Sequence, residues 1–421
     1  MNVVVLGSGG REHAICQSII KSKKINKLFC IPGNGGTASI ATNIDIDLKS
    51  FKKIKDFILK KHINLVVVGP EKPLVEGITD YLEKFRINVF GPNKFASQLE
   101  GSKIFTKKIC KKYKIPTANF VIKKNKKESL KYLKQTKYPI IIKADNLASG
   151  KGVYICKNQK QASRAVSEIF NGKFGLAKQI LFEEFLDGEE MSYFIISDGS
   201  TFKYFGNAQD HKRALEGDRG KNTGGMGAYS PSRIFTKNLE KKIIQKIIEP
   251  TFKALKDSNQ QFKGFLYAGL MIKNKEPYLI EYNVRMGDPE CQTILPILKN
   301  DFLDVLIACV KNNLSKKKII WKRKKSICVV LCSKGYPDKF KKRVKIKNLN
   351  LIKQKNSNEI IFHASTVNKK GEVYSDGGRV LSFVSISKSL YKSRDRILKL
   401  LKKLNWKNGF YRKDIGYKAL N

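Results

Sequence analysis

The 421-residue sequence predicts a mixed α/β protein with several domains, the first of which holds a doubly wound parallel sheet. The length indicates two or three domains, because one hydrophobic core rarely extends over more than about 250–300 residues. Residues 1–100 alternate short apolar runs with segments of helical apolar spacing, which is typical of parallel strands joined by helices. After Trp321 the charge run KRKK indicates a linker, and residues 326–421 are expected to form a separate small α/β domain.

The first domain is predicted to contain strands at residues 2–6, 27–31 and 65–68, with a helix over residues 51–58. Each strand ends in a glycine-containing turn: GSGG, PGNGGT and GPE. Ligands of such sheets bind beyond the carboxyl ends of the strands, where glycine amides can approach them closely. The first turn, followed by Arg11, suits a phosphate group, with a tight turn that binds nothing as the alternative. It departs from the dinucleotide-binding fingerprint, because the third glycine would fall at Glu12.

The next segment is predicted to be a helix that ends before Pro116, followed by a hairpin of strands 139–144 and 153–156 around ADNLASGKG. This loop does not match the phosphate-binding Walker A motif, because no glycine opens it and Gly152 stands where Ser or Thr should hold Mg²⁺. A glycine loop flanked by Lys143 and Lys151 instead resembles a flap that closes over a triphosphate. An exposed hairpin tip is the alternative.

Further along, residues 181–190 are predicted to be a strand that runs into a turn at Asp187 and Gly188, and its extended backbone could pair with an adenine edge. Residues 210–231 are long, polar and glycine-rich without periodicity, so we expect a structureless loop, and a functional loop is favoured over a disordered one. A helix over residues 239–255, interrupted by Pro250, and a strand over residues 265–272 follow.

Residues 278–290, YLIEYNVRMGDPE, concentrate groups that bind metal ions and anions. Glu281 and Asn283 are two residues apart, which on a strand places both side chains on the same face, where their oxygens can share a cation such as Mg²⁺. Arg285 is expected to continue this face and to bind phosphate oxygens in a fork. The alternative is a strand end with solvated charges.

The composition describes a soluble globular protein with a formal net charge of +47. A polyanion partner is one interpretation of this charge. The lysines are spread through nearly every segment without a basic tail, which favours a solvated lysine-rich surface. None of the eight cysteines forms a CxxC pair, so reduced and mostly buried thiols are expected. The sequence opens directly on a strand pattern and contains no long apolar run, which favours the cytoplasm.

Taken together, these segments closely resemble the glycinamide ribonucleotide synthetases, also called phosphoribosylamine–glycine ligases, within the ATP-grasp superfamily. The resemblance runs from the first residues to the last dozen. It rests on LGSGGREHA (6–14), PGNGGTA (32–38), VVGPEKPLVEG (67–77), LEGSKIFTK (99–107), KADNLASGKGV (143–153), EEFLDGEE (183–190), QDHKR (209–213), NTGGMGAYSP (222–231), GFLYAGLMI (264–272), IEYNVRMGDPE (280–290), GGRVL (377–381) and YRKDIGYKA (411–419). The departures are Asn146 for a usual Gly, Lys221 for Pro, Val284 for Cys and Met286 for Phe, and none removes a charged or metal-binding group.

The resemblance implies an ATP-dependent ligase that joins glycine to 5-phosphoribosylamine through a glycyl phosphate, the second step of de novo purine synthesis. It implies a substrate-binding domain over residues 1–100, an ATP-grasp domain over residues 101–325 with a flap at about 119–186, and a C-terminal domain over residues 326–421. It also implies a monomer whose partners are small molecules, with neither nucleic acid nor membrane among them.

The resemblance further implies residues for each part of the site. ATP would contact Lys103, Lys143, Gly150, Lys151, Gly152, Glu183, Glu184, Phe185, Leu186 and Glu190, and Mg²⁺ (or Mn²⁺) would be bound by Glu281 and Asn283. Glycine and the sugar amine would contact Gly9, Gly10, Arg11, Gly35, Gly36, Thr37, Glu71, Asn222, Thr223, Gly224, Gly225 and Met226. Catalysis would involve Arg285, Asp288 and Asp210.

Two rival hypotheses remain at this point. Another ATP-grasp ligase of purine or biotin chemistry would share the flap and the metal pair, although NTGGMGAYSP would not be expected in it. A nucleic-acid-binding protein would explain the charge, and it would show a steep salt dependence of its affinity for duplex DNA.

Overall fold

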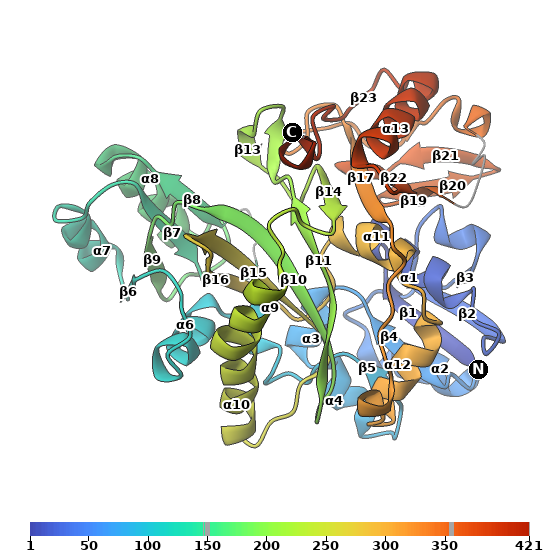
Figure 1. The fold of residues 1–421 in the computed structure, drawn as a ribbon, viewed down its shortest axis with the longest axis horizontal. Helices are drawn as coiled ribbons and strands as arrows, with labels where there is room; N and C mark the ends of the chain where they lie inside the picture. Colours follow the sequence, from blue (N-terminus) through green and yellow to red (C-terminus); the bar gives the residue numbers. More distant parts are fainter. Residues whose placement is uncertain (146, 148–151, 353–357, 421) are drawn as a thin grey trace.

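The computed structural model describes residues 1–145, 147, 152–352 and 358–420. It confirms a mixed α/β architecture of several sheets, with the N-terminal parallel sheet beside a long central sheet (Figure 1). Among the described residues, no helix is long and apolar enough to cross a membrane.

The N-terminal sheet has five parallel strands in the order β3-β2-β1-β4-β5. The three predicted strands are confirmed, and the middle of the sheet is buried because its strands are runs of Val, Leu and Ile. The elements are β1 (Asn2–Gly7), α1 (Gly10–Ile19), β2 (Lys27–Pro32), η1 (Thr37–Ser39), β3 (Thr42–Asn43), α2 (Phe51–Lys60), β4 (Leu65–Val68), α3 (Glu71–Glu76), α4 (Ile78–Glu83), β5 (Val89–Phe90) and α5 (Gln98–Gly101).

A four-stranded sheet in the order β6-β9-β7-β8, joined by α7 and α8, forms the flap with a hydrophobic cluster of its own. The predicted hairpin is confirmed, since β7 and β8 pair in antiparallel fashion on either side of the ADNLASGKG segment. Asn146, Gly150 and Lys151 lie outside the described residues. The elements are α6 (Lys103–Lys112), β6 (Phe120–Lys123), α7 (Lys126–Leu133), β7 (Ile140–Ala144), β8 (Val153–Cys156), α8 (Gln159–Phe170) and β9 (Ile180–Glu184).

The central sheet runs β16-β15-β10-β11-β14-β17-β22-β19, and β23 pairs with β17. The expectation of a structureless loop over residues 210–231 is wrong, because this segment forms a separate β12–β13 hairpin and the sheet strand β14. The elements are β10 (Glu189–Asp198), β11 (Phe202–Asp210), β12 (Arg213–Leu215), β13 (Arg219–Asn222), β14 (Gly227–Ser230), α9 (Lys237–Ile243), η2 (Ile244–Ile248), α10 (Glu249–Asp257), β15 (Lys263–Lys273), β16 (Glu276–Asn283), α11 (Glu290–Ile294), η3 (Leu295–Ile297), α12 (Phe302–Val310) and η4 (Leu314–Lys316).

Pro250 does not end the predicted helix. It is the second residue of α10, and the π-helical turn η2 joins α10 to α9. Proline lacks the N–H that an α-helix would use there, and the wider turn before it accommodates this loss.

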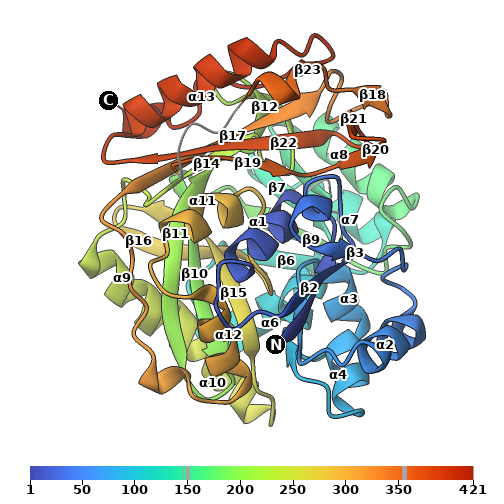
Figure 2. The same ribbon diagram turned by 90° about the vertical axis from the view of Figure 1, so that its right-hand side faces the viewer.

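The C-terminal segment extends the central sheet, because β17 pairs with both β14 and β22. Helix α13 lies along the outer face of these strands (Figure 2). The elements are β17 (Lys325–Ser333), β18 (Val344–Lys345), η5 (Leu349–Leu351), β19 (Glu359–His363), β20 (Thr366–Lys369), β21 (Glu372–Ser375), β22 (Arg379–Ser387), α13 (Leu390–Leu404), β23 (Gly409–Phe410) and η6 (Tyr417–Ala419). All eight cysteines are free and buried, as the sequence predicted.

Candidate functional site

One cavity of about 780 Å³ is lined by residues from the N-terminal sheet, the flap, the central sheet and the C-terminal segment. Most of the residues predicted to bind or react lie on its wall. They are Gly9, Arg11, Glu71, Lys103, Lys143, Gly152, Glu183, Glu184, Phe185, Leu186, Glu190, Asp210, Asn222, Thr223, Gly224, Glu281, Asn283, Arg285 and Asp288.

Glu281 and Asn283, the pair predicted to bind a metal ion, lie on β16, next to a register shift in the pairing of β16 with β15. Gly269 pairs with Glu281 and Leu270 with Leu279, so Ile280 is the extra residue of a bulge. Leu279, Glu281 and Asn283 all line the cavity, and Leu279 is almost completely buried. The pair therefore lies on the cavity wall directly after the bulge, at the point where the strand ends.

The donor set of this pair fits a hard cation. Burial alone would raise the pKa of the Glu281 carboxyl, but Lys212, Lys143 and Lys103 hold the pKa below its ordinary value, so the carboxylate stays ionised. Asn283 adds an amide oxygen, which accepts a hydrogen bond of 3.1 Å from Arg285. Mg²⁺ commonly takes one or two protein oxygens and completes its shell with water and phosphate oxygens. Within the described residues no group of three or more His, Cys, Asp and Glu side chains could hold a metal ion.

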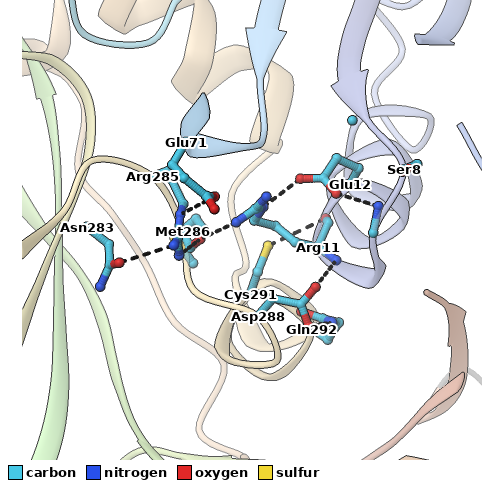
Figure 3. A network of polar contacts seen from close by, with 12 residues as sticks. Ser8, Arg11, Glu12, Glu71, Asn283, Arg285, Met286, Asp288, Cys291 and Gln292 are labelled. Carbon is cyan, nitrogen blue, oxygen red and sulfur yellow. Dashed lines mark hydrogen bonds and ion pairs between the residues drawn. The ribbon is translucent and has the colours of Figure 1, made fainter. Parts of the chain in front are cut away.

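Arg285 does not continue the strand as predicted, because β16 ends at Asn283. Its guanidinium group is held by two carboxylates instead. Nε lies 3.3 Å from Glu71 (Figure 3), and Nη2 donates to Glu100 at 2.6 Å. The other oxygen of Glu100 accepts the backbone N–H of Val284 at 2.8 Å. Arg285 lowers the pKa of Glu71 to about 2, so at least this partner stays ionised beside it. The side chain is thus fixed at the cavity wall beside Glu281 and Asn283.

The N-terminal turn of α1 is also occupied by carboxylates (Figure 3). Glu12 accepts the N–H of Gly9 at 2.6 Å and pairs with the Arg11 guanidinium at 2.5 Å, and Asp288 accepts the N–H of Arg11 at 3.3 Å. Burial would raise the pKa of Asp288, but Arg379 and Arg11 keep the pKa below its ordinary value. Protein carboxylates therefore already occupy this turn, and the contact with Asp288 joins it to the GDPE segment.

Glu183 forms a buried ion triad with two lysines. Its carboxylate lies 3.1 Å from Lys107 and 2.7 Å from Lys143, and all three side chains are at most 4% exposed. Burial opposes ionisation, yet Lys143 and Lys107 hold the pKa of Glu183 below its ordinary value. Lys143 also donates to the carbonyl of Ile280 at 3.4 Å. The triad thus fixes Lys143 between the flap and β16.

The neighbouring acids have partners of their own. Glu184 accepts hydrogen bonds from the backbone and side chain of Asn119 at 2.9 and 3.1 Å. Glu190 pairs with Lys212 at 2.8 Å, and although burial opposes it, Glu190 raises the pKa of Lys212 well above its ordinary value. Lys212 is therefore a firmly charged group on the cavity wall.

The loop 222–226 is held by Arg379 of β22. The Arg379 guanidinium donates to the carbonyls of Gly224 at 2.5 Å and of Asp288 at 2.6 Å, and it lies 3.3 Å from the Asp288 carboxylate. Gly225 has a φ of +112°, and a side chain there would meet Asp210 at 2.8 Å. Burial, with Glu290 nearby, raises the pKa of Asp210 well above its ordinary value, and its Oδ1 atom has no hydrogen-bond partner among the described residues.

Some predicted substrate-binding residues lie away from the cavity wall. Gly10 packs against Gln292 of α11, and Met226 is fully buried. The turn with Gly35, Gly36 and Thr37 packs against the C-terminal segment, since Gly35 donates its N–H to the carbonyl of Thr366 at 2.9 Å. The roles of these residues in binding stay predictions.

Sequence reasoning assigned no role to several residues that build the site: Glu12, Glu100, Lys107, Lys212 and Arg379. Each lies within one of the segments that carried the family resemblance, which was the available signal. Their partners are up to 185 residues away in the chain, and no local pattern predicts such pairs.

Comparison with known proteins finds matches along nearly the whole chain. The family models described as phosphoribosylglycinamide synthetase match as an N domain over residues 1–100, an ATP-grasp (A) domain over residues 101–291 and a C domain over residues 326–418. The chain belongs to the phosphoribosylglycinamide synthetase family. A curated relative from Brucella melitensis, named phosphoribosylamine–glycine ligase, is 42% identical over 421 residues. The aligned region covers 100% of this chain and 98% of the relative.

Solved structures agree with this membership. A phosphoribosylamine–glycine ligase from Thermotoga maritima has a TM-score of 0.85 and 31% identity, covering 99% of this chain and 100% of that one. A biotin carboxylase from Campylobacter jejuni has a TM-score of 0.72 with 15% identity, over 96% of this chain and 91% of that one. The similarity to the biotin carboxylase shows a shared fold alone. A shared fold does not by itself identify the substrate of an enzyme.

Proposed function

We propose that this chain is an ATP-dependent ligase that joins glycine to 5-phosphoribosylamine and releases ADP, phosphate and glycinamide ribonucleotide. The observation that supports this most directly is that the cavity is lined by residues from all three segments matched by the family models. The reaction is the second step of de novo purine synthesis.

The chemistry starts from a carboxylate, which is a poor electrophile because its negative charge resists attack. A glycine carboxylate oxygen attacks the γ-phosphorus of ATP, and ADP leaves. The amine of phosphoribosylamine then attacks the carbonyl carbon of the glycyl phosphate, its nitrogen loses a proton, and phosphate leaves. No covalent enzyme nucleophile is required, so positioning and electrostatics carry most of the rate.

The nucleotide occupies the flap end of the cavity. The ammonium groups of Lys103, Lys143 and Lys151 neutralise phosphate oxygens, with Gly150 and Gly152 allowing close approach of the flap loop. The segment Glu183–Leu186 lines the adenine. One carboxylate oxygen of Glu190 pairs with Lys212, and the other can accept a hydrogen bond from a ribose hydroxyl.

Glu281 and Asn283 would hold Mg²⁺ (or Mn²⁺), which when bound would neutralise negative charge on the phosphate groups. Arg285 lies beside this pair and stabilises the negative charge that develops on the transferring phosphoryl group and on the tetrahedral intermediate. Because Glu71 and Glu100 already fix the guanidinium, little reorganisation is needed when that charge appears.

Glycine and the sugar amine occupy the end of the cavity beside the loop 222–226. Asp288, held ionised by Arg379, and Asp210 orient the amino groups. Gly9, Gly10, Arg11 and the turn with Gly35, Gly36 and Thr37 receive the phosphate and ribose of phosphoribosylamine. The flap, which has its own hydrophobic core, closes before the acyl phosphate forms, because water would hydrolyse that intermediate.

We also propose that the protein acts as a monomer in the cytoplasm with small-molecule partners alone. In this view the net charge of +47 belongs to a solvated surface and not to a nucleic-acid or membrane site.

The test is ADP release by the purified protein with ATP, Mg²⁺, glycine and freshly generated phosphoribosylamine, with each component omitted in turn. Turnover that requires both glycine and the sugar amine is expected. ADP release that continues without glycine, or that needs a different acid, would keep the ATP-grasp machinery and overturn the substrate assignment.

A further inference from the structure

The C-terminal tail, defined here as residues 411–418, contains an arginine that is almost completely enclosed. The Arg412 side chain is 1% exposed, although it follows the short edge strand β23 near the end of the chain. In Figure 1 the C-terminus lies beside β13. An enclosed guanidinium is costly unless its donors are paired, so the partners of Arg412 identify what it holds in place.

Arg412 has partners within the tail and on the β12–β13 hairpin. Nε and Nη2 donate to the two oxygens of Asp414 at 2.8 and 2.7 Å. Nη1 donates to Asp218 at 2.9 Å and to the carbonyl of Arg213 at 3.0 Å. Asp218 and Arg213 belong to the hairpin, so one side chain connects two segments almost 200 residues apart in the chain.

Further bonds run along the same contact. The N–H of Gly217 donates to Asp414 at 2.9 Å, and the N–H of Gly416 donates to His211 Nε2 at 3.1 Å. Tyr417 donates its hydroxyl hydrogen to Asp218 at 3.0 Å, and the Lys418 ammonium lies 3.3 Å from the same carboxylate. The tail therefore holds the hairpin at its turn and at its base.

Apart from the tail, the hairpin is tied to the C-terminal segment by an exposed ion pair between Lys221 and Asp338 at 2.9 Å. It forms a two-stranded sheet separate from the central sheet, and most of its residues are exposed or half-buried. A two-stranded hairpin is marginally stable in water without further packing. Nevertheless Arg213 and Asp218 line the cavity, together with Lys418 of the tail itself. β13 ends at Asn222, where the loop 222–226 begins.

We propose that the C-terminal tail is a clasp that completes the substrate end of the cavity, with Arg412 as a positioning residue that fixes the β12–β13 hairpin. This inference rests on the proposed function, because it assigns to the hairpin end the glycine and sugar-amine subsites of that reaction. The nucleotide site proposed above lies against the flap, and none of its residues belongs to the β12–β13 hairpin. Loss of Arg412 should therefore weaken the use of glycine and phosphoribosylamine while the affinity for ATP stays unchanged.

The test compares wild type, Arg412→Ala and Arg412→Lys in the full chain. KM is measured separately for ATP, glycine and phosphoribosylamine, and ATP binding is also measured directly at equilibrium. We expect the KM for glycine, for phosphoribosylamine or for both to rise about tenfold in Arg412→Ala, with a smaller rise in Arg412→Lys, because misplacement of a positioned wall is costly. The control is Arg343→Ala, which removes an exposed ion pair with Asp376 in the same C-terminal segment, outside the cavity wall.

A second readout does not depend on turnover. Hydrogen exchange of the amides of residues 213–222 should become faster in Arg412→Ala, while exchange in β10 stays as in wild type. If Arg412→Ala fails to fold, Asp218→Asn removes the hairpin side of the same contact and decides the question by the same measurements.

The two hypotheses fail in different ways. The proposed function fails if the wild type shows no turnover that depends on glycine and the sugar amine. The clasp fails if hairpin exchange and all three KM values match wild type. It also fails if the KM for ATP rises in parallel with the others, or if only thermal stability changes, because a purely structural role would produce those results.

Discussion

Glutamine in place of Glu183 tests how the flap holds Lys143, the lysine that we propose to bind phosphate oxygens. The wild-type carboxylate lies between the ammonium groups of Lys107 and Lys143, with all three side chains buried. Glu183→Gln keeps the shape and removes the charge, which leaves two uncompensated buried cations. Removing one partner from a buried ion pair typically costs about 3–5 kcal/mol, a large part of the stability of one domain.

The assay is hydrogen exchange of the slowest amides of β7 and β9, which reports the free energy of opening the flap. We expect this free energy to fall by about 3–5 kcal/mol, and we expect ATP binding to weaken because Lys143 loses its fixed position. The wild-type contribution should be complete above the ordinary glutamate pKa of about 4.5 and should be lost as the pH falls below it, because the folded-state pKa of Glu183 is lowered.

The matched control is Glu276→Gln. Glu276 also lies between two lysines, Lys242 and Lys246, but at the surface with 36% of its side chain exposed. Loss of this charge should cost less than about 1 kcal/mol. If Glu183→Gln costs no more than Glu276→Gln and binds ATP as wild type does, the reasoning about the buried triad is refuted.

Three further predictions concern other parts of the protein. Arg285→Ala should lower kcat by about 10²–10³ and raise the KM for ATP much less, as steady-state kinetics will show, whereas the opposite pattern would remove Arg285 from the transition-state role. Gly225→Ala should raise the KM for glycine, because its methyl group would lie 2.5 Å from a proline ring; Gly371→Ala, which also has a positive φ but nothing within 4 Å, should leave the KM unchanged. Burial lowers the pKa of His13 to about 3 and of His363 to about 4, so both stay neutral when folded but bind protons when unfolded below about pH 6.5. The free energy of unfolding should therefore fall by about 1.4 kcal/mol per pH unit for each histidine as the pH drops from 6.5 towards 4, and urea denaturation of His363→Asn should give a shallower slope.

The local sequence pattern was enough to predict the strands and helices whose own residues carry an apolar pattern. The run of Val and Leu at β4 has the composition of a strand buried on both faces, and the observed bounds, Leu65–Val68, equal the predicted ones. The β12–β13 hairpin was missed for the opposite reason. Its strands, RAL and RGKN, have no apolar alternation, and they are held by the distant tail through Arg412. A strand that owes its order to charged partners far along the chain gives no periodic signal.

The same distinction applies to the candidate site. The spacing of Glu281 and Asn283 predicted that both side chains share a face, and both do line the cavity. The bulge at Ile280 and the fixation of Arg285 by Glu100 could not be predicted, because each depends on a pairing across the fold. The type of chemistry was visible in the residues, whereas the groups that orient them became visible only in three dimensions.

The pairing of cavity cations with carboxylates also changes how the net charge should be understood. Arg11, Lys143, Lys212, Arg285 and Arg379 each lie against at least one acid on or beside the cavity wall. The charge of +47 is therefore not concentrated where ligands are expected to bind, and attraction by excess charge is a weak explanation for recognition of a triphosphate. Each paired cation is instead held in one orientation by its own carboxylate. Recognition then depends on geometry that is already set, and changing the carboxylates should alter catalysis as much as changing the cations does.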